Sequence, residues 1–139
     1  MWKWFTRGRA SQDTPSENEP LKGAPPRART KTYSADTGYV YQYVYRGYRP
    51  LSAVGMEYVF EATRGRTQHF RVMIHLLDPE VAQCARAVGR DLIGGERYAL
   101  VKMSLFSALD QFTELAQFEK PLTPSAEAME DYLRVLGRI

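Results

Sequence analysis

Lys102 is the residue whose sequence surroundings most directly suggest chemistry. At about 100° per residue, the helical pattern around it places Lys102 between Tyr98 and Phe106, inside an apolar stripe. An amine that loses its hydration has a lowered pKa and could act as a base or a nucleophile. The alternative is that the stem packs while the ammonium reaches solvent, a carboxylate or a tyrosine ring. Since spacing identifies no second catalytic residue, an enzyme that uses Lys102 is the third of our functional hypotheses.

Metal and thiol chemistry have little support in the sequence. His69 and His75 share a predicted strand but stand six residues apart. That is about 20 Å at roughly 3.3 Å per residue, too far for both to bind one ion. Cys84 is the only cysteine and falls on an apolar helical stripe, so we expect a small buried side chain. We therefore predict no metal site and no cofactor.

A row of tyrosines forms the strongest pattern in the chain: Tyr39, Tyr41, Tyr43 and Tyr45. Because side chains alternate along a strand, all members of this row share one face of a sheet. They either pack beneath helices as core or face outward to stack on bases or a protein partner. The buried arrangement is favoured, because the residues between them then join charged side chains on the wet face. The row is kept as a candidate partner-binding surface, together with Arg64 and Arg66 at a predicted hairpin tip.

The elements that would position these residues follow a simple order. Period-two alternation predicts strands over about 39–46, 56–63 and 69–76. Start and stop signals predict helices over about 78–88, 96–112 and 124–136, the second with an alternative end at 117. The expected fold is therefore α+β, with a three-stranded antiparallel sheet followed by three helices packed on one face, in the order βββααα.

Composition divides the chain into a tail and one domain. Residues 1–35 carry seven basic and three acidic side chains with several prolines, whereas residues 36–139 carry twelve basic and thirteen acidic ones. The first stretch has too few apolar residues to offset its chain entropy, which predicts a disordered, basic, proline-rich tail. Residues 36–139 are long enough for a single α+β domain with its own core.

The first nine residues resemble an anchor in composition, with Trp2, Trp4 and Phe5 beside basic residues. One interpretation is weak peripheral membrane contact through residues 1–9. The other is a short peptide whose aromatic side chains dock on a protein groove. No apolar run has the length of a signal peptide or a membrane span, and the expected location is the cytoplasm.

These patterns favour a small non-catalytic interaction or accessory module that binds a protein partner. The alternative is a nucleic-acid-binding module that uses the basic tail and the tyrosine-rich sheet. Leu100 and Met103, on the otherwise polar side of the central helix, indicate contact with the third helix or with a second subunit in a homodimer.

Overall fold

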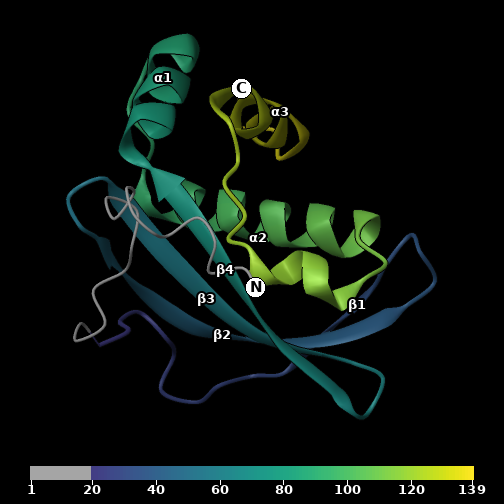
Figure 1. The fold of residues 1–139 in the computed structure, drawn as a ribbon. Helices are drawn as coiled ribbons and strands as arrows, with labels where there is room; N and C mark the ends of the chain where they lie inside the picture. The colour runs from purple at the N-terminus through teal and green to yellow at the C-terminus, as the bar shows by residue number, and fades with distance from the viewer. Residues whose placement is uncertain (1–19) are drawn as a thin grey trace.

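The computed structural model describes residues 20–139, which form a four-stranded antiparallel sheet followed by helices (Figure 1). The strands, adjacent in chain order, are β1 (Lys31–Ser34), β2 (Val40–Leu51), β3 (Gly55–Arg64) and β4 (Gln68–Leu77). The helices are α1 (Asp78–Val88), α2 (Gly94–Gln111), the short 3-10 helix η3 (Leu115–Glu119) and α3 (Ala126–Val135). The α+β class is confirmed, whereas the prediction of three strands is wrong because β1 adds a fourth.

Strand β1 comes from the segment assigned to the disordered tail, and distant contacts explain why it forms. The Tyr33 ring stacks on Phe106 with centroids 4.4 Å apart. Its hydroxyl donates to the Asp110 carboxylate at 2.8 Å, and the Asp36 backbone N–H donates to the same carboxylate at 2.9 Å. Both partners lie in α2, so local composition carries no sign of this stabilisation.

Strand β2 continues well past its predicted end. A β-bulge shifts its register between Tyr45 and Gly47, and pairing with β3 resumes after the bulge. The extra residue shifts the alternation by one, so Tyr48 returns to the same sheet face as Tyr45. Gly47 has a φ of 113°, and a Cβ there would lie 2.4 Å from the Lys22 carbonyl oxygen. Lys22 and Tyr48 exchange two backbone hydrogen bonds of 2.8 Å each, which hold residues 21–23 along this edge.

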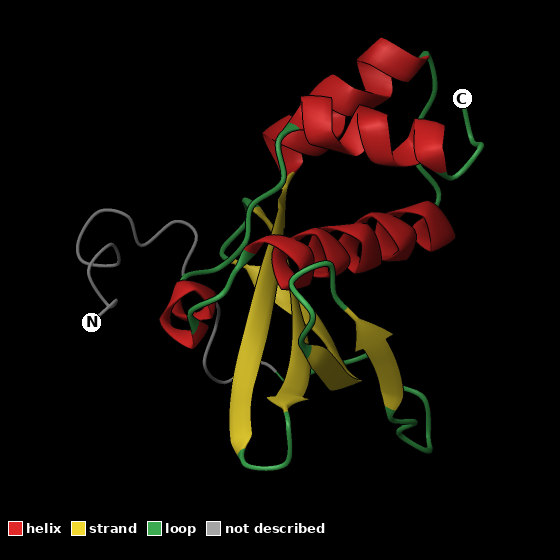
Figure 2. Ribbon diagram, turned by 90° about the vertical axis from the view of Figure 1, so that its right-hand side faces the viewer, coloured by secondary structure: helices red, strands yellow, loops and turns green. Residues whose placement is uncertain are grey.

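The helices form layers over one side of the sheet. Helix α2 lies along this side, called the inner face, where Phe106 and Tyr98 contact the tyrosines of β2. Helices α1 and α3 pack against each other at one end of the sheet, and α3 also packs on α2 (Figure 2). Of the three helices expected on one face, α2 lies on the sheet, whereas α1 and α3 form a pair at its end. Met129 of α3 is buried in the core.

The helix ends follow local signals in most places. The Ser125 hydroxyl accepts the Ala128 backbone N–H at 3.1 Å and caps α3, while Gly89, at a φ of 83°, ends α1. Helix α2 stops at Gln111, because Phe112 adopts an extended conformation, so the alternative end at 117 is wrong. The residues that follow form η3, whose buried Phe118 packs on Phe70 of β4 with ring centroids 4.7 Å apart.

Candidate binding surfaces

The tyrosine row is mostly core. Tyr41 and Tyr43 are buried on the inner face, with 0% and 5% of their surface exposed. Tyr43 meets Phe106 of α2 edge-on at 5.8 Å between ring centroids, and Tyr45 meets Tyr98 at 5.0 Å. Tyr41 and Tyr43 therefore support the fold and offer no ring to a partner, whereas Tyr45 is only partly covered.

The two hairpin arginines differ in what they contact. The Arg64 guanidinium lies 4.0 Å from the ring centroid of exposed Tyr39, and it donates to the Thr113 carbonyl at 2.8 Å. Those contacts tie the β3–β4 hairpin to the end of α2, so Arg64 has a structural role. Arg66 is exposed beside Gly65 at the tip, where a positive φ of 69° permits the tight reversal.

Lys102 lies among aromatic rings. Its Nζ is 5.5, 5.6 and 5.5 Å from the ring centroids of Tyr43, Tyr98 and Phe106. Burial, with a smaller contribution from Lys31, lowers the pKa of the Lys102 amine. Within residues 20–139, no carboxylate forms an ion pair with it. The arrangement is that of a cation on tyrosine rings, one of the alternatives left open by the sequence.

The remaining candidates are spread over the molecule. His75 is buried and pairs with Glu57 at 3.0 Å between Nε2 and Oε2, whereas His69 is exposed. Cys84 is buried in α1, and burial raises the pKa of its thiol. In the part of the chain that the structure describes, no group of three or more potential ligands surrounds a metal position. The anchor candidates Trp2, Trp4 and Phe5 lie outside the described residues.

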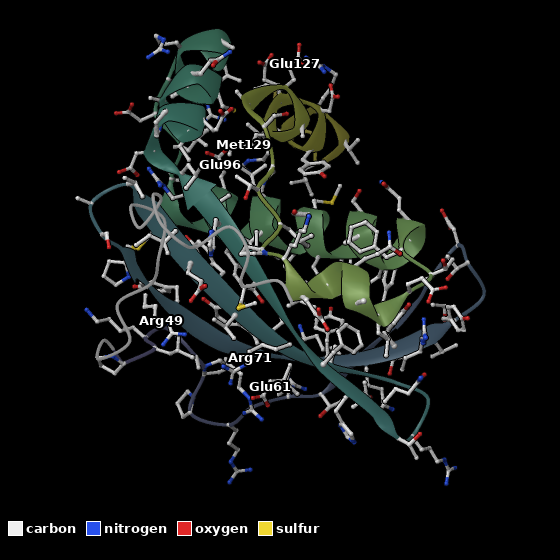
Figure 3. The ribbon with its side chains drawn as sticks, in the orientation of Figure 1. Arg49, Glu61, Arg71, Glu96, Glu127 and Met129 are labelled. Atoms are coloured by element: carbon white, nitrogen blue, oxygen red, sulfur yellow. The ribbon has the colours of Figure 1, made fainter. Side chains whose placement is uncertain are left out.

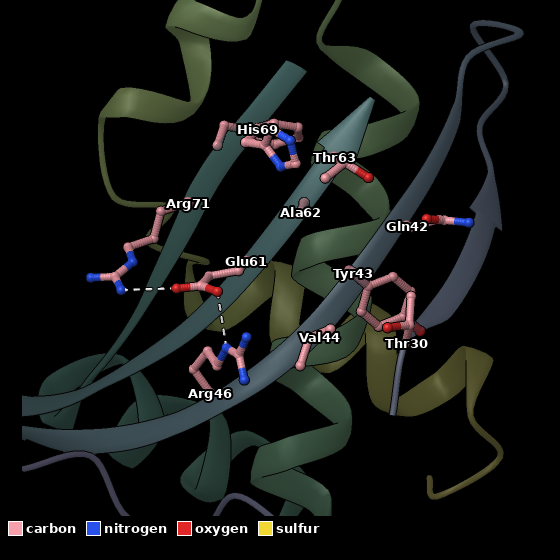
Figure 4. Close-up of a pocket in the computed structure, with 11 residues that line it drawn as sticks. Thr30, Gln42, Tyr43, Val44, Arg46, Glu61, Ala62, Thr63, His69 and Arg71 are labelled. Atoms are coloured by element: carbon pink, nitrogen blue, oxygen red, sulfur yellow. Dashed lines mark hydrogen bonds and ion pairs between the residues drawn. The ribbon is translucent and has the colours of Figure 1, made fainter. Parts of the chain in front are cut away.

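The outer face of the sheet, opposite α2, carries a polar groove of about 590 Å³ (Figure 4). We call it the outer groove; its charged and polar lining comes from Gln42, Arg46, Glu61, Thr63, His69 and Arg71. Glu61 bridges two strands, accepting from Arg46 Nε at 3.0 Å and from Arg71 at 3.1 Å. The hydrogen bond from Arg71, followed by that from Arg46, lowers the pKa of Glu61. Two guanidiniums per carboxylate leave the groove with an excess of positive charge.

A second ion cluster lies on the same face beside the outer groove. Glu57 is 1% exposed and accepts from Arg49 Nε at 2.9 Å while it pairs with His75. Burial alone would raise the pKa of Glu57, but its hydrogen bonds to His75 and Arg49 outweigh that effect and lower it. Arg49, Glu61 and Arg71 are marked in Figure 3. The cross-strand pairing expected for this face is present, although Glu57 and His75 are buried rather than wet.

A pocket of about 610 Å³ opens where the end of β2 meets the start of α2. We call it the tyrosine pocket; its side-chain lining is Tyr45, Tyr48, Met56, Tyr58, Arg97 and Tyr98. Gly23 and Pro25 form one rim, and Gly94 forms another. Burial raises the pKa values of Tyr45, Tyr58 and Tyr98, so these phenols are neutral near pH 7. The described lining of the pocket therefore combines flat apolar surfaces with a single cation, the Arg97 guanidinium.

The charges around this pocket are distributed unevenly. Glu96 points to the other side of α2, where its carboxylate takes two hydrogen bonds from Arg90, at 2.8 and 2.9 Å, and one from Arg138 at 3.0 Å. Together with the Ile93 backbone N–H, these donors lower the pKa of Glu96 to about 2. The residue after Glu96 is Arg97, which is half-buried. It forms no ion pair with any carboxylate of residues 20–139. The guanidinium of the tyrosine pocket is thus left uncompensated within the described chain.

Sequence reasoning missed the tyrosine pocket because the pocket depends on tertiary structure. Tyr48 joins it only through the bulge before Gly47, and Tyr98 only through the position of α2 across the sheet. One local signal was available, since a glycine inside an alternating strand is typical of a bulge. That signal would have placed Tyr48 beside Tyr45.

Comparison with known proteins gives no family for this chain: no family model, no curated protein and no solved structure matches it. Within residues 20–139, no helix combines the length and the apolar character needed to cross a bilayer.

Proposed function

We propose that this chain is a non-catalytic interaction module that binds a protein partner through the tyrosine pocket. The pocket itself is the observation that carries the proposal. Tyrosine and arginine are among the side chains most enriched at the energetic centres of protein interfaces, because they combine a large contact surface with a polar end. A half-open cavity lined by such residues accommodates a short peptide segment.

The chemistry of the pocket favours binding over catalysis. Among its described lining residues, none is a carboxylate, a histidine or a cysteine that could move a proton or attack a substrate. Lys102 lies nearby against Tyr98 but does not line the pocket. A role for Lys102 in packing explains its position without a reaction.

The test compares two variants of adjacent glycines. A Cβ at Gly94 or at Gly95 would meet no atom within 4 Å, so a side chain can leave the backbone at either position without a clash at its Cβ. Only Gly94 lines the tyrosine pocket, and Gly94→Phe would therefore fill it from the rim, whereas Gly95→Phe serves as the matched control. Random 12-residue peptides displayed on phage would be selected on the intact chain and measured against both variants.

We expect selected peptides to lose at least about ten-fold in affinity for Gly94→Phe, equivalent to about 1.4 kcal/mol, and to keep it for Gly95→Phe. Circular dichroism would establish that both variants are folded. Failure to select peptides, or equal binding to both variants, would contradict the proposal.

The second candidate function is nucleic-acid binding, and the outer groove is the observation that favours it. Arg46 and Arg71 outnumber Glu61 there, and the basic arm of residues 20–31 includes Thr30 on the groove wall. Phosphate contacts would need more free cations than this groove offers, since both arginines already pair with Glu61.

A further inference from the structure

We infer that the tyrosine pocket binds a peptide in which an aspartate or glutamate lies next to an aromatic or proline residue. This inference rests on the proposed function, because it names the partner chemistry of the same site. Two features carry it: the Arg97 guanidinium, which pairs with no carboxylate of residues 20–139, and the four tyrosine rings that line the same pocket. The rings also pack against the core, whereas Arg97 forms no ion pair within residues 20–139.

The sign of the ligand charge follows from the distribution of ion pairs. The described carboxylate nearest in sequence to Arg97 is Glu96, which is 4% exposed and occupied by Arg90 and Arg138. Burial raises the pKa of the Tyr58 phenol, and the positive charge of Arg97 partly offsets that rise. A cationic ligand would be repelled by Arg97, whereas an anion would supply the missing partner and form charge-assisted hydrogen bonds.

The number of cations favours a carboxylate over a phosphate. A phosphate group carries a charge of about −1.5 to −2 at neutral pH, and its binding sites use clusters of arginines. Among its described lining residues, the tyrosine pocket has one guanidinium, which matches the single charge and the two oxygens of a carboxylate. An aspartate or glutamate side chain, flanked by ordinary peptide, therefore fits the charge of the site.

The body of the pocket sets the second requirement. Tyr48 and Tyr58 lie with ring centroids 5.7 Å apart and tilted by 42°, and Tyr45 and Tyr98 meet at 5.0 Å. Rings arranged in this way present faces and edges that pack on an aromatic or proline residue. Within the chain, the Gly23 backbone already lies against one of these rings, since a Cβ there would lie 2.6 Å from Tyr48.

The experiment uses peptides selected on the intact chain and measures the binding of each one by fluorescence anisotropy. Each peptide is compared with its Asp→Asn or Glu→Gln form, against the unmodified chain, Arg97→Gln and Arg97→Glu. Arg86→Gln is the control, because Arg86 is an exposed arginine of α1 outside the pocket.

We expect the acid-to-amide change and Arg97→Gln each to reduce affinity by about ten-fold, with little further loss when both are made. Arg97→Glu should bind the version of the peptide that carries lysine in place of the acid, and Arg86→Gln should bind as the unmodified chain does. The inference would be overturned by peptides whose binding is weakened by Gly94→Phe but is unchanged by the Arg97 substitutions and by the acid-to-amide change. That result would leave the proposed function standing. Tighter binding of a phosphotyrosine peptide than of the acidic one would also overturn the inference.

Discussion

Single side chains in this protein differ sharply in how well their polar atoms are satisfied. Tyr41 is fully buried, and its hydroxyl has no hydrogen-bond partner among the described residues. Tyr33, on the neighbouring strand, donates its hydroxyl to Asp110 at 2.8 Å. Burial and this hydrogen bond raise the pKa of Tyr33 to about 12. A buried hydroxyl without a partner costs free energy, whereas one with a charged acceptor stabilises the fold.

The two tyrosines give a matched prediction. Tyr41→Phe should leave the free energy of unfolding within about 0.5 kcal/mol of the unmodified chain or raise it, because no bond is lost and a polar atom is removed from the core. Tyr33→Phe should lower it by about 0.5–1.5 kcal/mol. Urea unfolding followed by circular dichroism measures both values. A larger loss for Tyr41→Phe than for Tyr33→Phe would show that the Tyr41 hydroxyl has a partner.

Glu96 leads to a prediction about pH. Its pKa is lowered from 4.5 to about 2, so the ionised carboxylate stabilises the fold fully above the unfolded value, and this contribution is lost as the pH falls towards about 2. We expect Glu96→Gln to be less stable than the unmodified chain near neutral pH and to lose less stability on acidification. Urea midpoints between about pH 6 and about pH 2 test this.

Glu127 is the control for that measurement, because it is an exposed acidic residue in the first turn of α3 (Figure 3). Glu127→Gln should change the urea midpoint little and keep the pH dependence of the unmodified chain. Parallel pH curves for Glu96→Gln and the unmodified chain would rule out the assigned role of Glu96.

Among the elements, the edge of β2 is the place where local rules and tertiary contacts meet. The bulge at Gly47 both redirects Tyr48 into the pocket and permits residues 21–23 to pair with the strand. Two close approaches make this edge intolerant of side chains, one at Gly47 against Lys22 and one at Gly23 against Tyr48. The tyrosine pocket therefore depends on two glycines that lie in different segments.

Replacement of Gly47 tests this dependence. Gly47→Ala adds a Cβ against the Lys22 carbonyl at a positive φ, so we expect a loss of stability and exposure of the Lys22 and Tyr48 backbone amides to hydrogen exchange. Gly65→Ala is the control, because Gly65 also has a positive φ but a Cβ there meets nothing within 4 Å. It should cost only the conformational strain of about 1–2 kcal/mol. Equal protection of the Lys22 amide in both variants would contradict the account of this edge.

Charge is distributed unevenly over the whole molecule, with a nearly balanced stretch from residue 36 onward and a basic stretch before it. Residues 36–139 carry twelve basic and thirteen acidic side chains, and most of the described arginines of the sheet pair with carboxylates. Leu100 is fully buried within the chain, and Met103 lines a hollow with Tyr132 of α3. Contact with the third helix therefore explains these two residues, and the homodimer stays a prediction.

Charge at this scale predicts how the chain responds to nucleic acid. We expect random single-stranded RNA to bind weakly at low salt and to be released at about 150 mM salt, because the two arginines of the outer groove already pair with Glu61 and a phosphate contact weakens as salt rises. Electrophoretic shifts of the intact chain across a salt series measure this. Retention of RNA at about 150 mM salt, sensitive to Arg71→Ala, would favour the second candidate function over the first.

Several features were determined by the sequence alone, because short-range rules dictate them. Alternation placed three strands close to β2, β3 and β4, and the start and stop signals placed three helices over α1, α2 and α3. The burial of Tyr41 and Tyr43 followed from aligning the apolar faces of three strands. These predictions needed only the period of each element and the chemistry of its ends.

Tertiary structure decided the rest, because the relevant contacts join distant segments. Strand β1 is stabilised by the contacts of Tyr33 with Phe106 and Asp110 of α2, which no local pattern near Tyr33 could reveal. The position of α2 across the sheet brings Arg97 and Tyr98 beside the tyrosines of β2, and the β2 bulge adds Tyr48. Pocket chemistry arises where such elements meet, and their meeting depends on packing free energy summed over the whole core.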